Sequence, residues 1–194
     1  MGSGKILLKK MLKIIKNFLI FIIIISSSSN LYSNEELVQE LKEGGKIILI
    51  RHALAPGSGD PLNFDLKDCS TQRNLNKKGV KQSKKIGIFF ASENIPIDQV
   101  LSSEWCRCKD TAKYAFKKYE TFKALNSFFS EKFQKNRENQ MNDLLNFLKR
   151  WSNKKNLVLV THYVVILEIT NKPVSSGEIV ILDKNLNLVG TIVL

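Results

Sequence analysis

Hydrophobic and polar residues follow one another along the chain in blocks that predict the strands and helices of an α/β fold. Short apolar runs rich in β-branched residues, at 46–50 and 157–160, are typical of strands buried at the centre of a parallel sheet. The longer stretches between such runs carry apolar residues at helical spacing. Strands are predicted at 46–50, 97–101, 121–125 and 157–160, and helices at 34–42, 75–93, 105–119, 140–151 and 163–170.

The last part of the chain has the pattern of a β-hairpin. Two apolar runs, 178–182 and 188–193, flank the turn-forming residues Asp183, Lys184 and Asn185. Together with the strands and helices before it, this pattern predicts a three-layer α/β/α sandwich. Its central sheet is mostly parallel and ends in the C-terminal hairpin. About 160 residues are enough for one domain that buries roughly two thirds of its unfolded surface.

The first 33 residues have a different character from the rest. Five lysines precede the apolar run 18–25, and a run of serines follows it. This is the layout of a secretory signal peptide, and eight apolar residues are too few to span a bilayer, which needs about 20. We therefore predict a signal peptide at 1–33 and one domain at 34–194, in a periplasmic or secreted protein that has no stable membrane association after cleavage. An uncleaved anchor is the alternative, with Lys16 reaching the membrane interface.

The positive charge of the chain is partly that of its N-terminal segment. The full chain has a formal net charge of +12, but five lysines and no acidic residue lie in the first 33 positions, so the remainder carries +7. Nucleic-acid-binding proteins concentrate such charge on one face, whereas the lysines here are spread along the chain. No nucleic-acid partner is predicted, and the remaining positive field favours anionic substrates.

Three cysteines, Cys69, Cys106 and Cys108, lie in the predicted domain. An exported chain meets an oxidising compartment, where disulfides persist. Residues two apart on a helix face different directions, so at most one of Cys106 and Cys108 reaches Cys69. The sequence leaves open which one pairs. The spacing lacks the second Cys or His pair of a zinc site, and we predict no metal and no other cofactor.

Both histidines of the chain follow predicted central strands. His52 comes after the strand at 46–50, and His162 after the strand at 157–160. Ligands of open α/β sheets bind beyond the carboxyl ends of the strands, so one site can receive both imidazoles. Arg51 precedes His52 and offers a planar fork of donors for a phosphate, while a neutral imidazole can act as a nucleophile. The alternative is two unrelated histidines and an ordinary strand-end arginine.

Further candidates for phosphate binding lie at the next strand end and on a long loop. The hydroxyl residues Ser102 and Ser103 follow the second predicted strand, and Arg107 lies in the first turn of the following helix, where backbone N–H groups and the helix dipole favour an anion. The loop 53–74 is rich in Gly, Pro and Asp, and loops of this length are usually functional. It carries Arg73. We predict that Ser102 and Arg73 contact the substrate.

Taken together, these motifs resemble those of the histidine phosphatase superfamily, the phosphoglycerate-mutase-like enzymes, and in particular its small phosphatases. The family's Arg-His-Gly motif has its counterpart here, as do its Leu-Thr-x-x-Gly-x-x-Gln-Ala signature, its Ser-Ser-x-x-x-Arg-x-x-x-Thr-Ala signature and its second histidine. The matching positions are Arg51, His52 and Ala53; Leu75, Gly79 and Gln82; Ser102, Ser103, Arg107, Thr111 and Ala112; and His162.

The resemblance implies roles for these residues. His52 would be the nucleophile that becomes phosphorylated, and Arg51, Arg107 and His162 would hold the phosphoryl oxygens without a metal. Tyr163 follows His162, where the acid-phosphatase branch has an aspartate that serves as general acid. By position in the mutase branch, Glu131 is the predicted general acid. Four other carboxylates are rivals for that role: Asp60, Asp65, Asp68 and Glu104.

The predicted function is an exported, metal-independent phosphatase. It would hydrolyse small-molecule or envelope-linked phosphate monoesters through a phosphohistidine intermediate. A phosphoglycerate mutase or a protein phosphohistidine phosphatase is the alternative if the chain is not exported. A non-catalytic module that binds a phosphate ligand is a further alternative. A metal site made of the two histidines would lack nearby partner ligands. The oligomeric state is left open.

Overall fold

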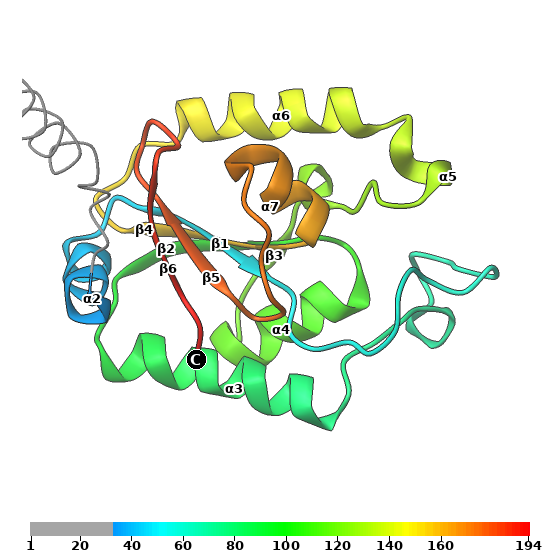
Figure 1. The fold of residues 1–194 in the computed structure, drawn as a ribbon, viewed down its shortest axis with the longest axis horizontal. Coiled ribbons are helices and arrows are strands. Elements are labelled where there is room, and N and C mark those ends of the chain that lie inside the picture. The colour runs from blue at the N-terminus through cyan, green and yellow to red at the C-terminus, as the bar shows by residue number, and fades with distance from the viewer. Residues whose placement is uncertain (1–32) are drawn as a thin grey trace, which may run out of the picture. The chain divides into compact units, whose positions relative to one another are not determined.

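The computed structural model describes residues 33–194. They form three layers, with a six-stranded sheet between two layers of helices (Figure 1). The strand order is β3-β2-β4-β1-β5-β6. Strands β1 to β4 are parallel to one another, and β5 and β6 form the antiparallel hairpin at one edge. The predicted fold class is confirmed. The strands are β1 (Ile47–Arg51), β2 (Ile97–Ser102), β3 (Glu120–Thr121), β4 (Asn156–Thr161), β5 (Ile179–Leu182) and β6 (Leu188–Ile192).

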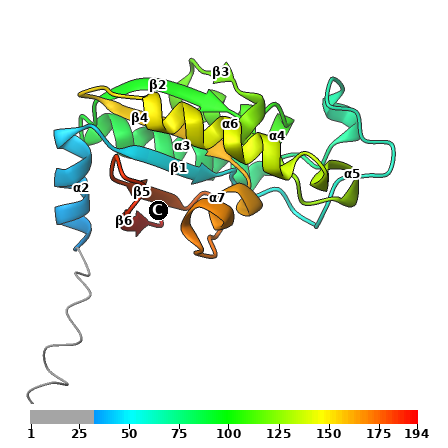
Figure 2. The same ribbon diagram turned by 90° about the horizontal axis from the view of Figure 1, so that it is seen from above.

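Helices cover both faces of the sheet (Figures 1 and 2). On one face lie α3 (Lys77–Ser92) and α4 (Cys106–Phe116), and on the other lie α6 (Arg137–Arg150) and α7 (Tyr163–Thr170). The remaining helical elements are shorter or lie at the ends of the sheet: α2 (Asn34–Glu43), α5 (Glu131–Gln134), η1 (Cys69–Thr71) and η2 (Lys123–Leu125). No helix within residues 33–194 has the length and apolar character needed to cross a membrane.

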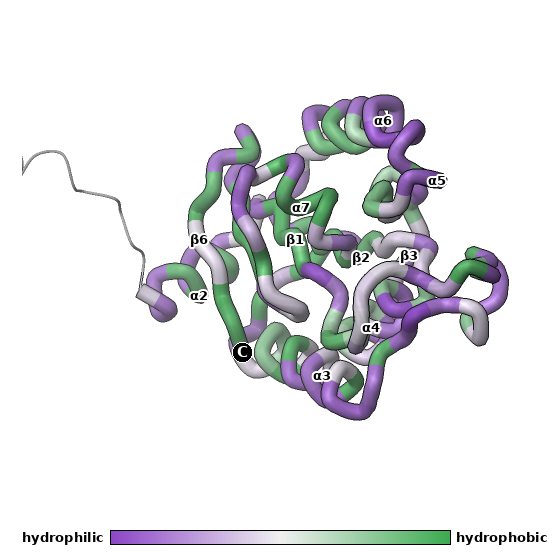
Figure 3. Tube along the Cα trace, turned by 45° about the vertical axis from the view of Figure 1, so that its right-hand side comes forward, coloured by the Kyte–Doolittle hydropathy of each residue, from purple (hydrophilic) through white to green (hydrophobic). Residues whose placement is uncertain are grey.

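The two-residue periodicity of the strands divides the apolar residues between two cores. In β1, Ile48 and Ile50 pack into the core with α3 and α4, while Ile47 and Leu49 pack into the core with α6 and α7. All four side chains are fully buried, which contributes about 1.5–3 kcal/mol each. Figure 3 shows β1 as hydrophobic, whereas α6 shows hydrophobic and hydrophilic residues around its turns because only one side of it is buried.

The largest difference from the predicted elements lies after α4. The predicted strand 121–125 is reduced to the two residues of β3, and η2 follows it. Ala124 and Leu125 are neighbours in sequence, yet both are buried in the same core. A strand would point them to opposite faces, so a 3-10 turn replaces it. The short helix α5, which the apolar pattern did not indicate, comes next.

The N-terminal boundary of the domain is a capped helix. Ser33 Oγ accepts a hydrogen bond from the Glu36 N–H, and the Glu36 carboxylate accepts one from the Ser33 N–H. Such caps are worth about 1 kcal/mol. Apart from Ser33, the predicted signal peptide lies outside the described residues.

Three parallel strands end at the same edge of the sheet and bring the sequence motifs together. Their register aligns Arg51 with Thr161, and Ser102 with Val160. Beyond these pairs, the His52 N–H donates to the Thr161 carbonyl at 2.9 Å. The motifs that follow β1, β2 and β4 therefore meet at one place.

Candidate active site

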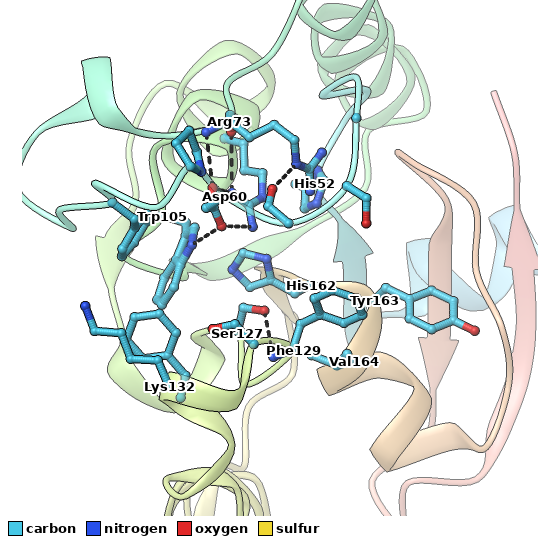
Figure 4. Close-up of a pocket in the computed structure, with 18 of the residues that line it drawn as sticks. His52, Asp60, Arg73, Trp105, Ser127, Phe129, Lys132, His162, Tyr163 and Val164 are labelled. Atoms are coloured by element: carbon cyan, nitrogen blue, oxygen red, sulfur yellow. Dashed lines mark hydrogen bonds and ion pairs between the residues drawn. The ribbon is translucent and has the colours of Figure 1, made fainter.

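A cavity of about 330 Å³ opens at this edge of the sheet (Figure 4). Its wall is formed by the ends of β1 and β4, the loop 53–74, the start of α4 and the segment around α5. Five of the seven predicted site residues line it: Arg51, His52, Arg73, Arg107 and His162. The fold thus gathers side chains from four separate segments around one space.

His52 is oriented by a hydrogen bond to its own neighbour. Its Nδ1 lies 2.8 Å from the Ala53 carbonyl oxygen. A carbonyl only accepts, so Nδ1 carries the proton and Nε2 keeps the lone pair. Burial, together with the positive charges of Arg107, Arg73 and Arg51, lowers the pKa of His52 to about 3. The imidazole is therefore neutral near pH 7 and has the protonation state that a nucleophile needs.

The backbone after His52 is held by residues of the other motifs. The Ala53 N–H donates to Thr111 Oγ1 at 2.9 Å, and the Leu54 N–H donates to Gln82 Oε1 at 3.0 Å. A side chain at Gly79 would collide with the Leu54 backbone, so only glycine lets α3 approach this closely. Thr111, Gln82 and Gly79 do not line the cavity, and their role is to position the backbone beside His52.

His162 lies beside His52, with a distance of 5.5 Å between the ring centroids. Its Nε2 forms a hydrogen bond of 2.8 Å with Ser103 Oγ and lies 3.4 Å from Cys108 Sγ. Burial lowers the pKa of His162 well below its ordinary value, and the charge of Arg107 adds to this effect. Ser103 thus holds a second neutral imidazole at the cavity wall.

Arg107 makes a bidentate ion pair with Asp60, a residue of the loop 53–74. The distances from its two terminal nitrogens to the carboxylate oxygens are 2.7 and 3.1 Å. Asp60 also accepts hydrogen bonds from Trp105 Nε1 and the Arg73 N–H, each at 3.1 Å. Burial would raise the pKa of Asp60, but the hydrogen bond and charge of Arg107 outweigh it and lower the pKa. Asp60 is therefore a carboxylate in this arrangement and has no proton to give.

Arg51 and Arg73 complete the cationic wall. Arg51 donates to the Val174 carbonyl at 2.7 Å, and its guanidinium lies 5.4 Å from the centre of the Tyr163 ring. Arg73 donates to the carbonyls of Gly59 and Ala55. The buried Nε atoms of Arg51 and Arg107 have no hydrogen-bond partner. Three guanidinium groups line the same cavity, so this wall suits an anion.

Two predicted site residues lie elsewhere. Glu131 is exposed as the first residue of α5 and does not line the cavity, although its neighbours Ser130 and Lys132 do. Ser102 is fully buried, and its hydroxyl donates to the Ser103 carbonyl rather than facing the cavity. The structure therefore shows no contact through which Glu131 or Ser102 would act on a ligand in the cavity.

The disulfide joins Cys69 to Cys106, which answers the question that the sequence left open. It ties η1, in the loop 53–74, to the first residue of α4, next to Arg107. Cys108 remains a buried thiol, and burial raises its pKa to about 12. Within residues 33–194, no three His, Cys, Asp or Glu side chains gather as ligands for a metal ion.

Both imidazoles are expected to stay neutral between pH 8 and pH 5. Burial and the surrounding guanidinium groups disfavour their protonation. Nitrogen-15 NMR of the imidazole groups measures this directly, since the chain has only two histidines. His52 should show the Nδ1–H tautomer, and a titration of either ring near pH 6.5 would contradict the expectation.

In the unfolded chain the two histidines protonate near pH 6.5, so the free energy of unfolding should fall as the pH drops below that value.

Asp60→Asn is expected to tighten the binding of inorganic phosphate about tenfold. Asp60 is ionised and occupies the donors of Arg107, so it repels and competes with a bound anion. The competitive inhibition constant of phosphate measures the effect. Asp65→Asn is the control, because Asp65 is an exposed residue of the same loop outside the cavity. Weaker binding in Asp60→Asn would mean that the carboxylate mainly holds Arg107 in place.

Comparison with known proteins agrees with this geometry. Residues 47–156 match the family model described as histidine phosphatase superfamily (branch 1). No match to the chain is found among curated proteins. Among solved structures, the chain is similar to the protein histidine phosphatase SixA complexed with tungstate, with 14% identity and a TM-score of 0.53 over 76% of this chain and 96% of that one.

Two further structures show the same fold at low identity. The putative phosphohistidine phosphatase SixA from Agrobacterium tumefaciens has 18% identity and a TM-score of 0.52, over 77% of this chain and 98% of that one. The phosphoglycerate mutase from Thermus thermophilus has 15% identity and a TM-score of 0.53, over 77% and 99%. Since the family model covers more than half of the residues, the chain belongs to the histidine phosphatase superfamily, branch 1.

Proposed function

We propose that the protein is an exported phosphatase that hydrolyses phosphate monoesters through a phosphohistidine intermediate on His52, without a metal. One observation carries the proposal. A neutral imidazole, with its Nδ1 proton held by the Ala53 carbonyl, lines a cavity together with three guanidinium groups. The nucleophile and the charge-stabilising groups of phosphoryl transfer are therefore in one place. The SixA structure with tungstate, an oxyanion, supports an anion site in this fold.

The reaction has two steps. In the first, the lone pair of His52 Nε2 attacks phosphorus, the P–O bond breaks, and the alkoxide takes a proton from water and leaves as the alcohol. The Ala53 carbonyl accepts from Nδ1–H and stabilises the positive charge that develops on the ring. In the second step, water attacks the phosphohistidine and releases inorganic phosphate and neutral His52. The guanidinium groups of Arg51, Arg73 and Arg107 stabilise the phosphoryl oxygens throughout.

The question of which group protonates the leaving group favours a second candidate function. The cavity-lining carboxylate of Asp60 is ion-paired with Arg107 and ionised, and Glu131 lies outside the cavity. An alcohol would then take its proton from water. A phosphohistidine substrate needs less help, because a neutral imidazole leaves more readily than an alkoxide. A protein phosphohistidine phosphatase is therefore the alternative, and two structural neighbours carry the name SixA.

Export is supported by the cysteines as well as by the N-terminal pattern. Cys69 is exposed, and its bond to Cys106 would be reduced in most cytoplasmic compartments. This favours a periplasmic or secreted enzyme that acts on small-molecule or envelope-linked phosphate monoesters. Cell fractionation with N-terminal sequencing of the purified protein tests the location and the removal of the leader. A cytoplasmic, unprocessed chain would instead favour a protein phosphohistidine phosphatase or a phosphoglycerate mutase.

The function is tested by hydrolysis of p-nitrophenyl phosphate in the presence of EDTA, with rapid denaturing quenching at alkaline pH to trap the phosphoenzyme. We expect turnover that is insensitive to EDTA, and a phosphoprotein that is stable to base and labile to acid, as a phosphoramidate is. A phosphohistidine peptide, assayed in parallel, separates the two candidates by their kcat/KM. Binding of phosphate without turnover of either substrate from pH 4 to pH 8 would identify a binding module instead.

A further inference from the structure

The cavity is divided into a cationic half and an apolar half. The guanidinium groups and the two imidazoles form the first. The second is lined by side chains from the loop 53–74, the start of α4, the segment around α5 and the start of α7: Leu62, Phe64, Trp105, Phe129, Phe133 and Val164. Lys132 stands on this side too, with its Nζ 5.5 Å from the centre of the Phe133 ring. Ser127 and Ser130, from the segment around α5, also line the cavity, and the Ser127 hydroxyl accepts a hydrogen bond from the Phe129 N–H at 3.3 Å.

The aromatic residues of this half form one packed cluster next to the catalytic side. Phe64 stacks on Trp105 with 5.2 Å between ring centroids, and Phe133 meets both rings edge-on at 5.7 and 5.3 Å. Trp105 in turn meets the ring of His162 edge-on at 5.4 Å. The apolar surface therefore begins directly beside the imidazoles.

The apolar half lies where a leaving group would depart. His162 is in contact with both rings, 5.5 Å from His52 and 5.4 Å from Trp105. Figure 4 shows His52 and Trp105 on opposite sides of His162 and Asp60. Phosphoryl transfer places the attacking and leaving atoms roughly in line across the phosphorus. A phosphoryl group attacked by His52 thus directs its alcohol toward the aromatic cluster.

We infer that the substrate is a phosphate monoester of a small apolar alcohol, about the size of one aromatic ring or a short alkyl chain. This inference rests on the proposed function. The cavity, at about 330 Å³, is near the lower end of ligand pockets, which range from about 300 to 1,000 Å³. A hydroxyl group placed against the three packed rings would lose its hydrogen bonds to water there, which costs affinity. At the mouth, Leu62 is fully exposed and Phe129 is 63% exposed, and such a ligand would cover them.

The test is the affinity of the protein for ethyl-, butyl- and hexylphosphonate, measured by titration calorimetry. These compounds keep the anion constant and are not hydrolysed, so binding is read without turnover. We expect Kd to fall two- to fourfold per methylene group, the upper value corresponding to full burial. Butylphosphonate should bind at least tenfold more tightly than 3-hydroxypropylphosphonate, which has the same number of non-hydrogen atoms.

Two matched variants locate the effect. Phe129→Ser should reduce the dependence of Kd on chain length. Ile88→Ser should leave it unchanged, since Ile88 is equally exposed, at 67%, but lies on α3 outside the cavity. Equal affinity for all chain lengths, tighter binding of the hydroxyl compound, or no binding would overturn the inference. If p-nitrophenyl phosphate is hydrolysed in that case, the proposed phosphatase function stands and only the apolar substrate is refuted. A Kd that depends on chain length, without hydrolysis of p-nitrophenyl phosphate, would support the apolar subsite and contradict the proposed phosphatase activity.

Discussion

His52→Ala is expected to lower kcat for p-nitrophenyl phosphate by about 10⁴-fold or more, the loss typical of removing a catalytic nucleophile. Without Nε2, no phosphohistidine forms, and water must attack the ester directly in a site built around the imidazole. The acid-labile phosphoprotein should disappear together with the activity. Steady-state kinetics and alkaline-quench trapping on the same preparations measure both losses.

The control for His52→Ala is the binding of phosphate. Arg51, Arg73 and Arg107 remain in the variant, so inorganic phosphate should still bind, and the cooperative unfolding transition should persist. A variant that binds phosphate and retains more than about a tenth of the wild-type kcat would refute the role of His52. A matching defect in His162→Ala, with the phosphoprotein still formed, would place His162 in phosphoryl binding rather than in covalent chemistry.

Removing the disulfide is expected to lower the free energy of unfolding by about 3–5 kcal/mol. The bond closes a loop with a sequence separation of 37, and the loss of chain entropy in the unfolded state grows with the logarithm of that length. Urea unfolding of Cys69→Ala against the wild type measures the change. Cys69 is exposed, so the substitution leaves no cavity. Activity should fall as well, because the bond ties the loop that carries Asp60 and Arg73 to the helix that carries Arg107.

A reducing agent supplies the internal control. Dithiothreitol should destabilise the wild type as much as the substitution does, and it should not change Cys69→Ala further. In Cys69→Ala the two remaining thiols, Cys106 and Cys108, are both buried, so neither is readily available for exchange. A loss below about 1 kcal/mol would show that the loop is held by its other contacts. Among these are the ion pair of Asp60 and the hydrogen bond from the Cys106 N–H to Gln72 Oε1.

The strands, the layers and the position of the motifs could be predicted from the sequence because they depend on local patterns. A run such as 47–50 is apolar at every position, and only a strand covered on both faces buries all of it. The side-chain period of two then divides these residues between two cores. Parallel strands place their carboxyl ends at one edge of the sheet, and the histidines after β1 and β4 meet there because these two strands are also neighbours.

The details of the cavity depend on contacts between distant segments, and no local pattern encodes them. The pairing of Asp60 with Arg107, and of Cys69 with Cys106, follows from how the loop 53–74 folds back onto α4. Glu131 looked suitable by its place in the chain, but η2 and α5 turn that segment so that its neighbours face the cavity. Composition and periodicity therefore determined the sheet and the strand-end motifs of this protein. The tertiary structure alone decided which carboxylate meets Arg107, because the direction of a loop side chain is set by long-range packing.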